Sequence, residues 1–197
     1  MKNTKKVWIP AIAGAMVALM LLAYYYYTNS LNSGEHFRPR RPEGGALFTT
    51  MGTIALYVAA AGFSWYWFKK KLKSPSAIVR YVGRLLHKVH KWLGWATLAL
   101  GATHGTYLLV TRIDDNKIYS GLASFAILLF LAGYGIYIPK IRNKWMRVVH
   151  RTLGMAWVPV LFIHAGGSVL LAAMAAVAVN GLIWLFEKQA VGATQRG

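Results

Sequence analysis

Hydrophobic residues in this chain fall into long blocks that are separated by short basic stretches. A helix needs about 20 mostly apolar residues to cross the hydrocarbon core of a bilayer, and several of the blocks reach that length. The pattern predicts an all-α fold, an integral membrane bundle of six transmembrane helices that forms one domain over residues 1–197. The predicted spans are 7–27, 47–68, 90–110, 118–138, 148–165 and 167–186.

Two boundaries need further argument. Residues 148–186 are nearly continuously apolar and too long for one helix across a bilayer of about 30 Å, so we divide them at Gly166-Gly167-Ser168. The first span follows a lysine-rich start and could be a cleaved signal peptide. Its apolar run exceeds the usual length of about 7–15 residues and ends in four tyrosines without a small-x-small cleavage site, which favours an uncleaved helix.

Composition and charge agree with a membrane protein. Hydrophobic residues make up 56% of the chain and charged residues 14%, and the net charge is +18. Most of the 23 basic residues fall in the segments that are cytoplasmic if the N-terminus is inside, which predicts cytoplasmic N- and C-termini in a bacterial inner (plasma) membrane. We therefore expect membrane lipid and no nucleic acid as a partner. The absence of cysteine excludes disulfides and thiolate ligands.

Four histidines occur at a repeated spacing. The stretches "HKWLGWATLALGATH" and "HRTLGMAWVPVLFIH" each begin and end with histidine, at His90 and His104 and at His150 and His164. A separation of fourteen positions is close to four helical turns, so each helix carries its two histidines on one side, about 21 Å apart. The third and fifth helices run in the same direction, which predicts that His90 faces His150 and that His104 faces His164.

Two facing histidine pairs at two depths are typical of two stacked b-type haems, each with one axial nitrogen from each helix. Any one intramembrane histidine could instead form a hydrogen bond to a neighbouring helix. A single metal site shared by both pairs is disfavoured by their separation, and a proton relay is a further alternative. The repeated frame favours two haem b groups whose iron atoms are bound by the four histidines.

Other residues near these positions are candidates for haem contacts. Gly94 and Gly154 each follow the inner histidine by one turn and could admit a flat macrocycle or pack helices. Trp157 lies seven residues from both His150 and His164, where it could shorten the path between haems or fill volume. Basic residues that could meet the haem propionates, or only set topology, are Arg84, Lys88, Lys91, Arg147 and Arg151 inside and Arg112, Arg38, Arg40 and Arg41 outside.

The remaining histidines have a different setting. His87 is about 60° round the helix from His90, so we interpret it as interfacial, near a propionate at most. His36 lies in an outer loop rich in arginine and proline, where we expect it to be exposed to solvent.

Residues 75–90 are predicted to form a cytoplasmic amphipathic helix with which the third helix begins. Ser74-Pro75 has the form of an N-cap followed by proline at the first helical position. Apolar residues then recur at helical spacing between basic ones, at Ile78, Val79, Val82, Leu85, Leu86 and Val89. This helix could lie at the membrane interface, dock an electron-donating protein, or do both.

The two histidine stretches resemble the ferric reductase-like transmembrane domain shared by ferric reductases, NADPH oxidases and short bacterial haem membrane subunits. The resemblance implies that His90, His104, His150 and His164 are axial ligands and that electrons cross from the cytoplasm to the exterior. Only eleven residues follow Phe186 and no G-x-G-x-x-G fingerprint occurs, so a self-contained NADPH oxidase is not expected.

The sequence therefore predicts a membrane electron conduit, an oxidoreductase component without its own dehydrogenase domain. The donor would be a separate cytoplasmic flavoprotein or a membrane quinol, and the acceptor would be ferric iron, oxygen or a partner protein outside. Two alternatives stay open: a quinol-oxidising haem subunit of an extracytoplasmic reductase, and a non-redox structural or assembly protein whose histidines brace helices.

Overall fold

The computed structural model describes residues 4–31 and 45–194, and over these residues it consists of helices joined by short turns, without a strand. This confirms the all-α class. Six α-helices and one short 3-10 helix follow one another along the chain. They are α1 (Thr4–Leu31), α2 (Gly45–Phe68), η1 (Lys69–Lys71), α3 (Ala77–Thr111), α4 (Lys117–Ile141), α5 (Lys144–Ala165) and α6 (Gly167–Thr194).

Five of these helices, α1, α2, α4, α5 and α6, are long and apolar enough to cross a membrane, which is typical of a multi-pass membrane protein. The helix α3 contains the predicted span 90–110 but is not among the five. Its 35 residues include basic side chains in the first half and two histidines in the second, which lower its apolar character. Five of the six predicted spans therefore coincide with helices that are long and apolar enough to cross a membrane.

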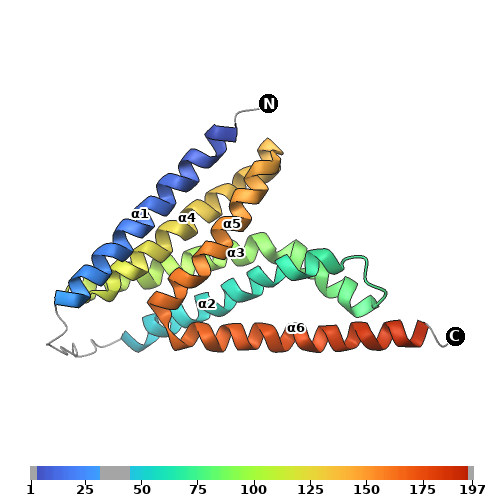
Figure 1. Ribbon diagram of the computed structural model, residues 1–197. Coiled ribbons are helices and arrows are strands. Elements are labelled where there is room, and N and C mark those ends of the chain that lie inside the picture. Colours follow the sequence, from blue (N-terminus) through green and yellow to red (C-terminus); the bar gives the residue numbers. More distant parts are fainter. Residues whose placement is uncertain (1–3, 32–44, 195–197) are drawn as a thin grey trace.

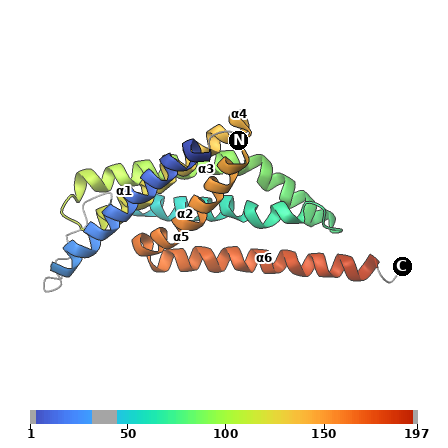
Figure 2. The ribbon, with the colours of Figure 1, turned by 45° about the horizontal axis from the view of Figure 1, so that its top comes forward.

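The helices form two packed groups that meet at α3 and α4 (Figures 1 and 2). The first group contains α1, α4 and α5, which lie side by side in both views. In the second group α2 packs along α3, and α6 runs beneath α2. The α5–α6 turn is at Gly166, where φ is 54°, as the predicted division at Gly166-Gly167-Ser168 requires.

The start of α3 differs from the prediction. Ser76 caps the helix, because its hydroxyl accepts a hydrogen bond from the Val79 backbone N–H at 3.5 Å. The hydroxyl of Ser74 accepts from the Ser76 N–H instead. The helix therefore begins at Ala77 rather than at Pro75, because the chain turns once more before the helical hydrogen bonds begin.

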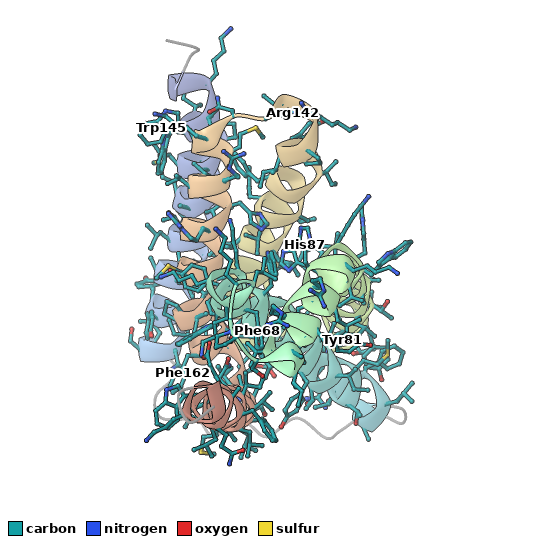
Figure 3. The ribbon with its side chains drawn as sticks, turned by 90° about the vertical axis from the view of Figure 1, so that its right-hand side faces the viewer. Phe68, Tyr81, His87, Arg142, Trp145 and Phe162 are labelled. Atoms are coloured by element: carbon teal, nitrogen blue, oxygen red, sulfur yellow. The ribbon has the colours of Figure 1, made fainter. Side chains whose placement is uncertain are left out.

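The first half of α3 packs one side against the rest of the bundle and leaves the other side exposed. Val79 is fully buried and forms a hydrophobic cluster with Phe68 of α2 and Ile183 of α6. The side chains of Val82 and Leu86 pack against the same cluster. Ile78 and Leu85 of the predicted apolar stripe point outward and are exposed, as is Tyr81 (Figure 3). Only part of the stripe is therefore free to meet lipid or a partner.

Candidate functional site

The four histidines of the repeated frame meet as two pairs. The ring centres of His90 and His150 are 6.3 Å apart with an interplanar angle of 83°. Those of His104 and His164 are also 6.3 Å apart, at 73°. The first histidine of α3 thus faces the first of α5, and the second faces the second, so the two helices run in the same direction. This is the pairing that the spacing predicts.

The histidine side chains approach one another although their helices do not pack closely. Helix α3 packs on α2 and α4, and α5 packs on α4 and α1, whereas α3 and α5 are not among the helix pairs in substantial contact. All four histidines are partly exposed. The rings therefore extend from two helices into the space between them.

Three of the histidines are oriented by a backbone carbonyl of a neighbouring helix. The Nδ1 of His90 is 3.0 Å from the Gly62 carbonyl, and that of His104 is 2.7 Å from the Phe48 carbonyl, both on α2. The Nδ1 of His150 is 3.0 Å from the Leu131 carbonyl on α4. A carbonyl oxygen only accepts, so Nδ1 carries the hydrogen and Nε2 keeps its lone pair.

His164 is oriented in the same way by a side chain. Its Nδ1 is 3.1 Å from the hydroxyl of Ser120, a fully buried residue of α4. That hydroxyl donates to the Lys117 carbonyl at 2.8 Å, so its oxygen is left to accept from the imidazole N–H. The four rings thus share one tautomer, with Nε2 available as a ligand.

Each ring also lies against a glycine of the helix that orients it. A β-carbon on Gly52 would be 2.8 Å from the ring of His104, and one on Gly121 would be 2.9 Å from the ring of His164. At Gly135 it would be 3.4 Å from the ring of His150, and at Gly62 it would be 4.0 Å from the Nδ1 of His90. These four glycines were not predicted from the sequence.

A signal for two of them is present in the sequence. Gly121 and Gly135 are fourteen positions apart on α4, the same separation as that of His150 and His164 on the antiparallel α5. Each glycine therefore comes level with one histidine. On α2, Gly52 and Gly62 are ten positions apart, which does not match the separation of fourteen positions between His90 and His104.

The two glycines that were predicted to lie near the haems, Gly94 and Gly154, have different surroundings. Gly94 is exposed, and a β-carbon there would meet no other atom within 4 Å. Gly154 is buried, and its β-carbon would make an ordinary contact of 3.8 Å with Leu131 of α4. Gly94 therefore faces open space, while Gly154 lies at the packed α4–α5 interface.

Trp157 is part of the hydrophobic core. Its indole N–H donates to both the backbone carbonyl and the hydroxyl of Ser124 on α4, each at 2.9 Å. The ring packs with Ala18 and Leu22 of α1 in the largest buried cluster. Of the two predicted roles, filling volume is the one with direct contacts in the structure.

The predicted basic residues are mostly on the surface. Arg84, Lys91 and Arg151 are exposed. Arg112 caps the C-terminus of α3, and its Nε is buried without a hydrogen-bond partner in the described part of the chain. The predicted Arg38, Arg40 and Arg41 and also His36 lie outside the described residues.

His87 is separate from both pairs. Its ring stacks on that of Trp65, with centres 4.7 Å apart and an interplanar angle of 25°. It is exposed on the side of α3 seen in Figure 3. This agrees with its interpretation as a residue away from the ligand positions.

The spacing of each pair fits two imidazoles bound to opposite sides of one metal ion. A metal–imidazole bond is about 2.0 Å and a ring nitrogen is about 1.1 Å from its ring centre, so such rings have centres about 6.2 Å apart. Within the described ranges, no group of three or more His, Asp or Glu residues could hold a metal ion. A metal ion between the histidines would need its other ligands from outside these side chains, for example from a cofactor or from water.

Comparisons with protein-family models, with curated proteins and with solved structures found no match.

Proposed function

We propose that this protein is a transmembrane electron carrier that holds one b-type haem between His90 and His150 and a second between His104 and His164. The observation that carries the proposal is the shared geometry of the pairs. In each pair two imidazoles lie 6.3 Å apart, centre to centre, with both Nδ1 atoms bonded elsewhere and both Nε2 lone pairs available. In its two pairs of histidines, the proposed carrier resembles the ferric reductase-like transmembrane domain.

The residues of this chain would orient the histidine ligands, and the bound haem would supply the redox chemistry. Bound haem supplies one-electron chemistry between ferric and ferrous iron. Hydrogen bonds from Nδ1 to a carbonyl or hydroxyl hold each ring in place and raise the basicity of Nε2. Two histidines holding one haem would leave its iron without a free position for a substrate, which would favour electron transfer over reaction at the iron.

The histidine spacing sets the two levels of the haems in this proposal. On each helix the two histidines are about 21 Å apart along the axis, which would place one haem near each membrane face. The second half of α3, residues 90–110, would then cross the membrane as a sixth span, with both termini in the cytoplasm. The donor would be a cytoplasmic flavoprotein or quinol, and the acceptor ferric iron, oxygen or an outer partner.

In this proposal, Arg112 binds an anionic group of the haem between His104 and His164. The Nε of Arg112 is buried without a hydrogen-bond partner among the described residues. Arg112 is eight positions beyond His104, about 12 Å along the axis. A haem propionate is an anion that would satisfy this donor.

The test is the haem content of the purified protein and of matched variants. We expect two b-type haems per chain in a pyridine haemochrome assay, one in His90→Ala, one in His104→Ala, and two in the control His87→Ala. One haem in the wild-type protein would confine the redox site to a single level. A colourless protein would overturn the proposal and favour the non-redox alternative, in which the same Nδ1 hydrogen bonds brace the helices.

A further inference from the structure

A second site is present at the end of the bundle where α1 begins and α4 passes into α5. A groove of about 1440 Å³ lies there between the three helices. Figure 3 shows Arg142 and Trp145 at this end, beside the start of α1. The groove is larger than the roughly 300–1,000 Å³ of a typical small-molecule pocket.

The groove changes from basic to apolar along its length. One end is lined by four basic side chains, Lys6, Arg142, Lys144 and Arg147. The other end is lined by Leu129, Phe130 and Gly133 of α4. Residues 129–141 of α4 extend about 18 Å. The lining therefore changes from basic to apolar along α4, from its C-terminal end toward its middle.

The charge of the groove is unbalanced. No acidic residue lines it. Among the described residues, Glu187 pairs with Lys71 on another part of the bundle, and Asp114 and Asp115 lie in the α3–α4 connection, at the other end of α4. The four cations are therefore available to an external anion, and the N-terminus of α5 beside Lys144 adds to their attraction.

Aromatic residues stand between the two ends. Tyr134 and Tyr137 line the groove, and the hydroxyl of Tyr134 donates to the Val7 carbonyl, which holds α1 to α4. The ring of Trp145 lies edge-on to that of Trp8 at 6.5 Å and under the Lys144 ammonium at 5.6 Å. Tryptophan and tyrosine are enriched at the level of lipid headgroups.

The apolar end has a formed floor. Phe130 lies directly over Gly14 of α1, where a β-carbon would collide with its ring. A β-carbon on Gly133, in contrast, would meet no atom within 4 Å. The groove is thus open at Gly133 and bounded by Phe130.

We propose that this groove binds an anionic phospholipid, with the phosphate at Lys6, Arg142, Lys144 and Arg147 and an acyl chain along Leu129, Phe130 and Gly133. The chemistry of the groove matches that of the molecule from end to end: a concentrated negative charge, then an interfacial region, then hydrocarbon. A soluble anion would use only the basic end, and a zwitterionic lipid would bring a positive charge of its own next to the four cations. Clusters of basic residues next to membrane helices recognise anionic lipids in this way.

The test is lipid retention measured by native mass spectrometry on the purified full-length protein. Phosphatidylglycerol and phosphatidylcholine with identical acyl chains are added separately. We expect one phosphatidylglycerol per chain to be retained, with phosphatidylcholine retained several-fold less. Equal retention of the two lipids would overturn the proposal.

Substitutions at the basic end and at the apolar end test the two parts of the groove separately. Lys144→Gln with Arg147→Gln should weaken phosphatidylglycerol retention by about tenfold, and the equal charge change in exposed Lys69→Gln with Lys70→Gln should not. Gly133→Leu, which fills the apolar end without changing charge, should also reduce retention. Its control is Gly181→Leu on α6, where a β-carbon likewise meets nothing within 4 Å.

The remaining outcomes decide the class of ligand. Helix content by circular dichroism checks that each variant is folded. If folded groove variants retain the lipid as well as the wild-type protein does, the groove is not its site. If millimolar inorganic phosphate displaces the lipid, the site recognises a soluble anion and the proposal is wrong.

Discussion

The ring of His104 lies so close to Gly52 that a β-carbon on this glycine would be 2.8 Å from the imidazole. The same helix supplies the carbonyl of Phe48 that holds the Nδ1 of His104 at 2.7 Å. The orientation of this ring therefore depends on α2 both through a hydrogen bond and through the absence of a side chain.

Gly52→Ala should displace the His104 ring and lower the haem content from about two per chain to about one. The physical reason is that the added carbon meets the imidazole itself, which must rotate away from its partner His164. Haem per chain by the pyridine haemochrome assay is the measurement. Gly105→Ala on α3 is the matched control, because a β-carbon there meets nothing within 4 Å. Full haem content in Gly52→Ala would show that the close approach is not required.

Ser120→Ala should weaken haem binding at the second pair by about 10–100-fold, as loss of a hydrogen bond to a ligating histidine does. The substitution leaves the His164 Nδ1–H without its acceptor, which frees the ring to rotate and lowers the basicity of Nε2. Haem titration of the apoprotein checks this, with the first pair as an internal reference. The control Ser64→Ala removes a serine of α2 whose hydroxyl, within the described ranges, bonds to its own helix at the Ala60 carbonyl. Equal affinities in the two variants would refute a role for Ser120.

The sequence was sufficient to predict the helices and the histidine pairing, because both depend on periodicity along one segment. The spacing of His90 from His104 and of His150 from His164 determines which rings can meet once the helices run in the same direction. The supporting residues could not be predicted in this way. Ser120 is 44 positions from His164 and Gly62 is 28 from His90, so their contacts depend on how α2 and α4 pack against α3 and α5.

The start of α3 was misplaced for a local reason. Ser74 and Ser76 both have a hydroxyl that can cap a helix, and proline follows the first of them. The side chain of Arg80 decides between them, since it donates to the carbonyls of Ser74 and Pro75 at 2.7 and 2.8 Å and holds that segment outside the helix. Such a contact cannot be inferred from the N-cap pattern alone.

Trp157→Phe should lower the stability of the protein by about 1–3 kcal/mol while leaving two haems per chain. The variant loses the indole hydrogen bonds and leaves the buried Ser124 hydroxyl without its donor. The measurement is thermal unfolding in detergent together with haem content. Trp92→Phe is the control, because Trp92 is 73% exposed. If Trp157→Phe instead kept its stability and slowed electron transfer between the haems, Trp157 would be part of the electron path.

Arg112→Gln should lower the midpoint potential of the haem at the second pair. Loss of a nearby positive charge favours the oxidised iron, which carries one more positive charge than the reduced iron, so the potential shifts to more negative values by tens of millivolts. The Nε of Arg112 is buried and has no hydrogen-bond partner among the described residues, so we expect solvent to screen its charge only weakly. Potentiometric titration of the two haems is the measurement, and His104→Ala identifies which of the two belongs to the second pair. Lys69→Gln, an exposed charge in η1, is the control and should shift neither potential. An unchanged potential in Arg112→Gln would show that this arginine does not contact the haem.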